Sequence, residues 1–242
     1  MAGSVESSPD PVAGRDPSPV AFVAIMLALV TGFVDAFGFL HVVPVFPANQ
    51  SGNAVFLGMS IGGTSPAPGW APPVAIATFM IGAAAGRWTA LRVGVRRSAP
   101  ILLGVETLLL VALAVARAAA STSAPFTTTV AQAAVLAVAA LAMGSQTEVI
   151  RSVAGVAVST TYQSGAIARI AETIGMGRGQ ERDTERRLLV VLSALLVAYV
   201  AGAALGASGL GDGRIGLVTP AVLVAGLFAL SLRGVLRSDE GW

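Results

Sequence analysis

The chain has no cysteine and a single histidine among its 242 residues. Disulfide bonds and thiolate metal sites are therefore excluded, and so is a metal site built from several histidines. Charge is also scarce: 12% of the residues are charged, against roughly 25% in a typical soluble domain. With 55% hydrophobic residues and a mean hydropathy of +0.78, the composition is that of a membrane protein.

Lysine is absent too, so all 15 basic residues are arginine, which we attribute to genomic composition. The arginines gather at the ends of apolar stretches, as membrane topology requires, and we expect no nucleic-acid partner. We also expect no enzyme and no cofactor. The sequence has no phosphate loop, no His-Glu-x-x-His motif and no pair of catalytic carboxylates. An intramembrane serine hydrolase would need His41, the only histidine, beside Ser51 or Ser164.

Six continuous apolar stretches are each near the ~20 residues that cross a bilayer as a helix. Continuous runs rather than alternating ones predict an all-α membrane bundle. The stretches lie at about 20–40, 71–91, 100–117, 129–150, 188–208 and 215–233. Arginines follow the second, fourth and sixth stretches, and the connection 41–70 has none. This alternation predicts six spans in a bacterial cell (inner) membrane with both termini in the cytoplasm.

One short pattern occurs twice, and each copy follows an apolar helix and precedes a helix with Gly-x-x-x-Gly. The copies are Gln50-Ser51-Gly52 with Ile61-Gly62, and Gln163-Ser164-Gly165 with Ile174-Gly175. Each half then has three spans and one short helix, and an odd number of spans gives the halves opposite orientations. We expect an inverted repeat in which segments 50–62 and 163–175 are broken or re-entrant helices. The predicted divisions are a disordered tail 1–19, repeats 20–118 and 129–233, an external linker 119–128 and a C-terminal tail 234–242.

The two polar breaks offer hydroxyl and amide groups at matching places, and a helix start carries free N–H groups at its positive end. Pro44 and Pro47 interrupt the first helix, and Ser51 or Asn53 is expected to cap the next one. The alternative is a pair of interfacial turns with ordinary caps. The predicted solute-binding residues are Asp35, Gln50, Ser51, Gly52, Asn53, Gln146, Thr161, Gln163, Ser164 and Gly165.

Asp35 and Glu106 are carboxylates inside apolar stretches, where a charge costs on the order of 3 kcal/mol on insertion scales. Asp35 is the candidate group for coupling to a proton or sodium ion. Its alternative role is structural, as the partner of an arginine or a helix terminus. We expect Glu106 to be buried and protonated, or paired with an arginine.

The Gly-x-x-x-Gly pairs predict close helix packing, within the bundle or in a homo-oligomer. They consist of Gly82 and Gly86, and of Gly202 and Gly206.

The runs 32–39, Gly52-Asn53, Gly144-Ser145-Gln146 and Thr160-Thr161 resemble the YoaK family of bacterial integral membrane proteins, a domain of unknown function. The resemblance extends over about 20–233 and implies about six helices but no reaction or substrate. Two positions depart from the family pattern: Ser51 stands where threonine is usual, and Thr147 where asparagine is frequent.

We therefore expect a permease-like transporter of a small solute, embedded in the lipid bilayer, with its site where the two breaks meet. Helix N-termini facing that site would favour an anionic or zwitterionic solute. The alternative is a structural or signalling membrane protein without transport.

Overall fold

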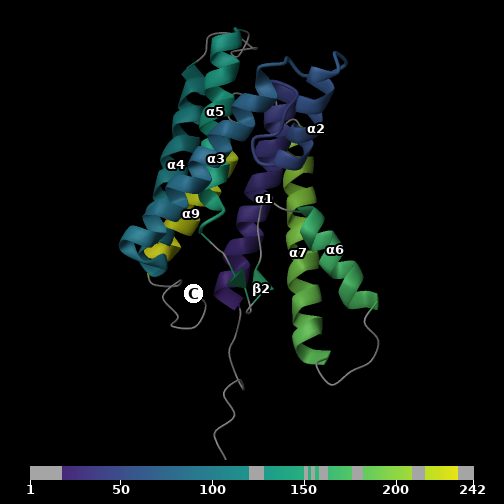
Figure 1. The fold of residues 1–242 in the computed structure, drawn as a ribbon. Helices are drawn as coiled ribbons and strands as arrows, with labels where there is room; N and C mark the ends of the chain where they lie inside the picture. Colours follow the sequence, from purple (N-terminus) through teal and green to yellow (C-terminus); the bar gives the residue numbers. More distant parts are fainter. Residues whose placement is uncertain are drawn as a thin grey trace, which may run out of the picture.

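A computed structural model describes residues 18–119, 128–149, 152–153, 156–157, 163–175, 182–208 and 216–233. These residues form long helices that lie side by side, parallel or antiparallel to one another, with shorter helices beside them (Figure 1). The long ones are α1 (Ser18–His41), α3 (Ala71–Val93), α4 (Val95–Ala119), α5 (Thr129–Gln146) and α7 (Arg182–Ala207). The shorter ones are α2 (Gln50–Ile61), α6 (Gln163–Gly175) and α9 (Val218–Leu232).

Each of the six predicted apolar stretches contains a helix. Five of the helices are long and apolar enough to cross a membrane, by length and composition. The sixth, α9, is apolar but has 15 described residues, short of the ~20 that span a bilayer. Three boundaries differ from the prediction by four residues or more: α4 begins at Val95 rather than near 100, α5 ends at Gln146 rather than near 150, and α7 begins at Arg182 rather than near 188.

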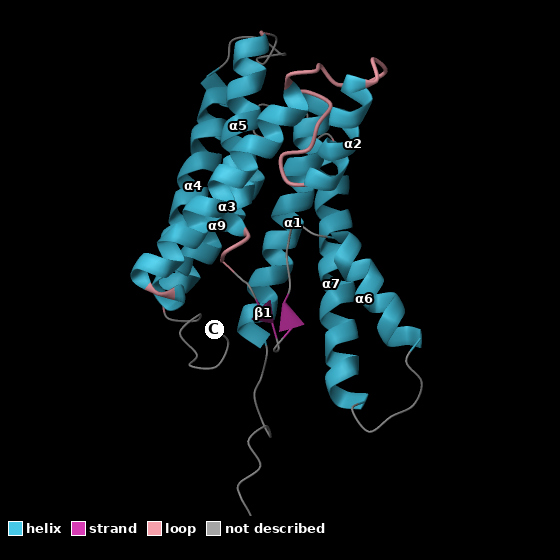
Figure 2. Cartoon of the chain, in the orientation of Figure 1, coloured by secondary structure: helices cyan, strands magenta, loops and turns pink. Residues whose placement is uncertain are grey.

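A small hairpin that the sequence analysis did not predict follows α5. Strands β1 (Ser152–Val153) and β2 (Val156–Ala157) pair antiparallel and lie at the lower end of α1 (Figure 2). Two residues per strand give no period-two pattern long enough to recognise in an apolar sequence.

Two helix pairs with very close backbones organise the bundle. α1 packs along α7, and α3 packs along α5. A β-carbon on Gly202 would overlap the carbonyl oxygen of Leu29, and one on Gly206 would lie 2.5 Å from that of Phe33. Both helices advance by four residues between these contacts, so α1 and α7 run in the same direction.

The α3–α5 pair repeats this arrangement. A β-carbon on Gly82 would overlap the carbonyl oxygen of Leu141, and one on Gly86 would lie 3.1 Å from that of Ser145. α3 and α5 are therefore also parallel. Backbones at this separation gain van der Waals contact and Cα–H···O interactions, which is how helices associate in lipid. The two Gly-x-x-x-Gly pairs thus lie inside one chain's helix–helix contacts.

The start of α2 lies deep beside α1 rather than at its end. The ring of Pro47 lies against Gly38, where a β-carbon would approach it to 2.8 Å, and the next residue, Ala48, is hydrogen-bonded to Asp35. After α1 ends at His41, the chain thus runs back along it before α2 begins. Asp35 is six residues before that end, which corresponds to about 9 Å of helix rise.

Helix α6, the counterpart of α2 in the second part of the chain, lies against α7 and starts beside it about halfway along the bundle (Figure 1). It runs down and away from there, whereas α2 runs up toward the opposite end. Both short helices thus start beside long helices and head toward different ends of the molecule.

Large apolar side chains cover the outer faces of the long helices and of α9. The exposed fractions are 70% for Leu108, 66% for Val197 and 62% for Val222. In water such a surface would promote aggregation, whereas lipid tails solvate it. The exposed surface and the five long helices identify a multi-pass membrane protein.

Candidate functional site

Asp35 joins the first polar break to the second half of the chain. Its Oδ1 accepts hydrogen bonds from the backbone N–H groups of Ala48 (2.7 Å) and Asn49 (3.4 Å). Its Oδ2 accepts one from the hydroxyl of Tyr199 on α7 (2.8 Å). The side chain is 2% exposed. The carboxylate therefore lies just before the N-terminus of α2, where it binds the N–H groups of the two residues that precede the helix.

Asn53 closes the first break from the other side. Its Oδ1 accepts from the N–H of Phe46 (2.9 Å), while its Nδ2 donates to the carbonyl of Phe46 and to Oε1 of Gln50 (2.9 Å). The Nε2 of Gln50 donates to the carbonyl of Pro47 (2.9 Å). These bonds satisfy the backbone groups that the prolines leave without helical partners.

The cap of α2 is Asn49, not Ser51 or Asn53 as predicted. Oδ1 of Asn49 accepts from the N–H of Gly52 (3.2 Å), because α2 already begins at Gln50. Ser51 is exposed and lies away from the buried hydrogen bonds, and Gly52 allows the Phe46 ring to pack directly on the helix backbone.

The second break is described only in part. Gln163, Ser164 and Gly165 form the first turn of α6, and Gly165 is partly exposed. Thr161 lies outside the described residues. The side chains of Gln163 and Ser164 also lie outside the description, so their predicted role stays a prediction.

Gln146 forms a second polar contact, deep in the bundle. Its Nε2 donates to the carbonyl of Leu27 on α1 (3.1 Å). Thr31 donates to the same carbonyl (2.8 Å) and lies 3.4 Å from Oε1 of Gln146. Both side chains are at most 1% exposed. An amide and a hydroxyl thus meet where α1 and α5 touch, and Thr31 is at the midpoint of the span Ala21–His41.

A small cavity lies between this polar pair and the start of α2. α1, α4 and α5 form its walls, together with Pro47 and Leu217. The side chains that line it are apolar, including Val34, Phe37 and Leu136. In this arrangement the cavity excludes charged groups.

Sequence reasoning missed Tyr199 and Thr31. Tyr199 is 164 positions from its partner Asp35, and only the packing of α7 on α1 brings the two together. Thr31 looks like an ordinary helix residue, because hydroxyls in apolar helices commonly bond back to their own helix. A tyrosine inside an otherwise apolar span was the available signal, since its hydroxyl needs a partner when buried.

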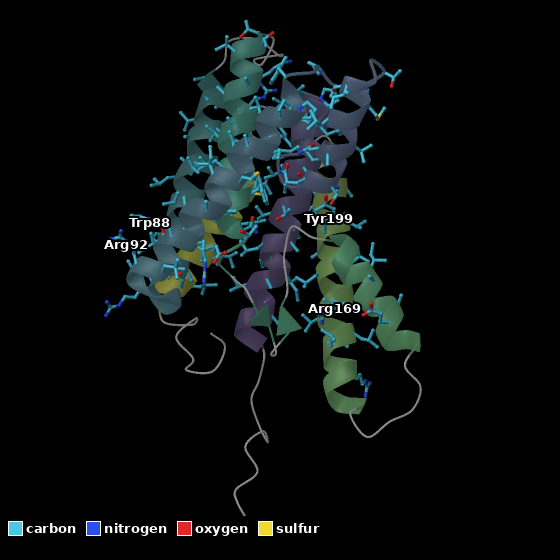
Figure 3. The ribbon with its side chains drawn as sticks, viewed as in Figure 1. Trp88, Arg92, Arg169 and Tyr199 are labelled. Atoms are coloured by element: carbon cyan, nitrogen blue, oxygen red, sulfur yellow. The ribbon has the colours of Figure 1, made fainter. Side chains whose placement is uncertain are left out.

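Arginines lie near the C-terminal end of α3 and on α6, and Arg117 lies in the last turn of α4. Figure 3 labels Arg92 on α3 and Arg169 on α6, both lower in the view than Tyr199 on α7. The guanidinium of Arg92 lies 5.0 Å from the centre of the Trp88 ring, and both side chains are exposed. Tryptophan and arginine are the side chains that favour the boundary between lipid and water.

A comparison with family models gives one match, over residues 23–230, to a protein family of unknown function (DUF1275). No curated protein and no solved structure matches the chain. The match covers both halves and agrees in extent with the region that resembles the YoaK family. This integral membrane protein therefore belongs to the DUF1275 family.

Proposed function

We propose that the chain is a permease-like transporter of a small solute, built from two inverted halves. The first half contains α1 to α4, and the second contains α5, α6, α7 and α9. The single observation that carries the proposal is the buried contact of Thr31 and Gln146, where the first helix of each half meets the other. Inverted-repeat transporters bind their solutes near the midplane at the interface between repeats.

Residue-by-residue equivalence of the close contacts supports the inverted repeat. Gly32 meets the Tyr199 carbonyl as Gly144 meets that of Phe79. Adding 112 converts each α1 position into its α5 counterpart (29 to 141, 32 to 144, 33 to 145). Adding 120 converts each α3 position into its α7 counterpart (79 to 199, 82 to 202, 86 to 206). Constant offsets over three contacts are expected of two copies of one packing unit.

The direction of the helices agrees with opposite orientations. α1 runs parallel to α7, and α3 to α5, as six spans entering from the cytoplasm require. The arginine-rich lower end would face the cytoplasm of a bacterial cell, with both termini there, and α2 would face outward. On this orientation α9 belongs to the sixth span, which returns the chain to the cytoplasm.

The lining favours a small uncharged solute over an anion. The two N–H groups just before α2 already bind the Asp35 carboxylate, and its negative charge disfavours an anion there. The cavity on the outer side of Thr31 is apolar. The amide of Gln146 and the hydroxyl of Thr31 would then provide the hydrogen bonds that orient the solute.

In this proposal Asp35 holds the two halves together on the outer side and does not bind the solute. It ties the first break of one half to Tyr199 of the other half. Opening the outer side requires these two elements to separate, which breaks a buried hydrogen bond to a carboxylate. A coupling ion that binds Asp35 would change the strength of this hydrogen bond, and it would thereby favour either the inward-open or the outward-open form of the transporter.

The test uses the natural absence of cysteine. Thr31→Cys, in sealed vesicles of either orientation, is treated with a small thiol reagent that does not cross membranes. We expect labelling from both sides, because each half-cycle exposes the site to one side. Val200→Cys is the matched control at similar depth, since Val200 is 59% exposed toward lipid and is expected to stay unlabelled.

The second candidate is a membrane protein with a structural or signalling role and no transport. It is favoured by the first break, where Asp35, Gln50 and Asn53 all make hydrogen bonds within the protein. Under this alternative Thr31→Cys is labelled from neither side. Labelling from one side alone would indicate a cavity that opens only to that side, which would also count against transport.

A further inference from the structure

Glu106 is the most isolated charged-type side chain in the described part of the chain. It lies near the middle of α4 and is 0% exposed. Neither carboxyl oxygen has a hydrogen-bond partner among the described residues. Asp35, by contrast, has three. The proposed transport site does not use Glu106.

The helices around Glu106 bring no compensating charge. α4 packs against α9, α5 and α3. The described residues of α9 and α5 include no titratable side chain, and α3 has only Arg87 and Arg92, both near its lower end and exposed. On α4 itself the nearest arginines with described side chains are Arg97 and Arg117, nine and eleven residues away, or more than about 13 Å along the helix.

The nearby contacts are apolar. Leu103, one turn before Glu106, and Leu110, one turn after it, are fully buried. Two residues before Glu106, the Phe228 ring of α9 lies 3.2 Å from where a β-carbon of Gly104 would be. The hydroxyl of the neighbouring Thr107 donates to the carbonyl of Leu103 (2.7 Å) and so serves its own helix. Hard metal cations require several oxygen ligands together, which this environment does not provide.

An isolated carboxylate in such a place is far too costly, and the group takes up a proton instead. We propose that Glu106 is a proton-binding site that is filled while α4 is packed against α9, α5 and α3 as in this structure. A rearrangement of these helices around α4 would bring water to the carboxyl and let the proton leave. If the chain is the proposed permease, Glu106 supplies a coupling proton site in addition to Asp35; that last step alone rests on the proposed function.

A hydrophobic carbodiimide detects this state directly. The carboxylic acid adds across one C=N bond: its oxygen bonds to the central carbon, and its proton goes to nitrogen. The acyl group then migrates from oxygen to nitrogen and leaves a stable N-acylurea, with no atom lost and no oxidant needed. The reaction requires a protonated carboxyl that the reagent reaches through lipid.

The experiment treats the full chain in lipid vesicles at neutral pH with dicyclohexylcarbodiimide, or with a water-soluble carbodiimide. We expect the peptide containing Glu106 to gain the mass of one reagent molecule with the first reagent only. Glu106→Gln should lose this label, and Asp35→Asn should keep it. In addition, the infrared band of a protonated carboxyl in the wild-type protein should disappear in Glu106→Gln.

An unlabelled Glu106 without a protonated carboxyl band, or equal labelling by the water-soluble reagent, would overturn the proposal. The wild-type measurements do not depend on whether a variant folds. A labelled Glu106 together with a Thr31→Cys that reacts from neither side would refute transport and leave the proton site standing. The two proposals therefore fail separately.

Discussion

Replacing Gly202 with alanine should strongly destabilise the protein. Among glycine-to-alanine changes, only those at the other close helix–helix contacts should be as damaging. The new β-carbon would overlap the backbone carbonyl oxygen of Leu29, which cannot rotate away. α1 and α7 must then separate and lose their close contact, and we expect a loss of about 3 kcal/mol or no folded protein. Thermal unfolding of the purified protein in detergent, with elution as a single species, measures the effect.

Gly226→Ala is the matched control in another apolar helix. A β-carbon there meets nothing within 4 Å. The same chemical change should be neutral, or should stabilise the protein by about 0.5 kcal/mol through helix propensity. Gly82→Ala should behave like Gly202→Ala, because it meets the carbonyl of Leu141 in the equivalent way. Equal stability of Gly202→Ala and Gly226→Ala would contradict the packing described here.

Asp35→Ala should be the next most damaging change. It leaves the N–H groups of Ala48 and Asn49 and the hydroxyl of Tyr199 buried without their acceptor. A buried donor without a partner costs about 1–3 kcal/mol, so we expect a total loss of about 3 kcal/mol in unfolding free energy. The measurement is thermal or denaturant unfolding in detergent.

Asp35→Asn is the control of equal size, because its amide oxygen still accepts from Ala48 while its NH2 group can donate to the tyrosine oxygen. It should lose less than half as much as Asp35→Ala. In a double-mutant cycle, the stability losses from Asp35→Ala and Tyr199→Phe should be non-additive, since both variants remove the same hydrogen bond. Additive effects would mean that Asp35 and Tyr199 do not interact.

The sequence alone predicted the helices well because continuous apolar runs have few alternatives in a membrane. It predicted the glycine pairs as packing surfaces, but not that α7 would meet α1 and α3 would meet α5. The choice of partner depends on shape along whole helices. α9 and α5 are shorter than their apolar stretches, because hydropathy does not show where a backbone leaves the helix.

The sequence allowed us to predict which polar residues would be buried, but not which groups they would bind. Asp35, Asn53 and Gln146 are buried polar groups in an apolar chain, which hydropathy alone reveals. Their partners are Tyr199, the Phe46 backbone and Leu27, respectively. The partners at Phe46 and Leu27 are backbone groups and carry no sequence signal. Tyr199 is a visible polar residue in an apolar span, but nothing in the sequence pairs it with Asp35. The cap of α2 was placed too late, because the chain's return along α1 brings Asn49 to the helix start.

On the proposed function, the two halves have opposite orientations in the membrane. The most direct measurement places single cysteines at Thr64, just after α2, and at Ala171 in α6, both exposed positions. An impermeant thiol reagent is applied to intact cells and to inside-out vesicles. We expect Thr64→Cys to react only from outside and Ala171→Cys only from inside. Reaction of both from the same side would contradict the inverted repeat and the transport site built on it.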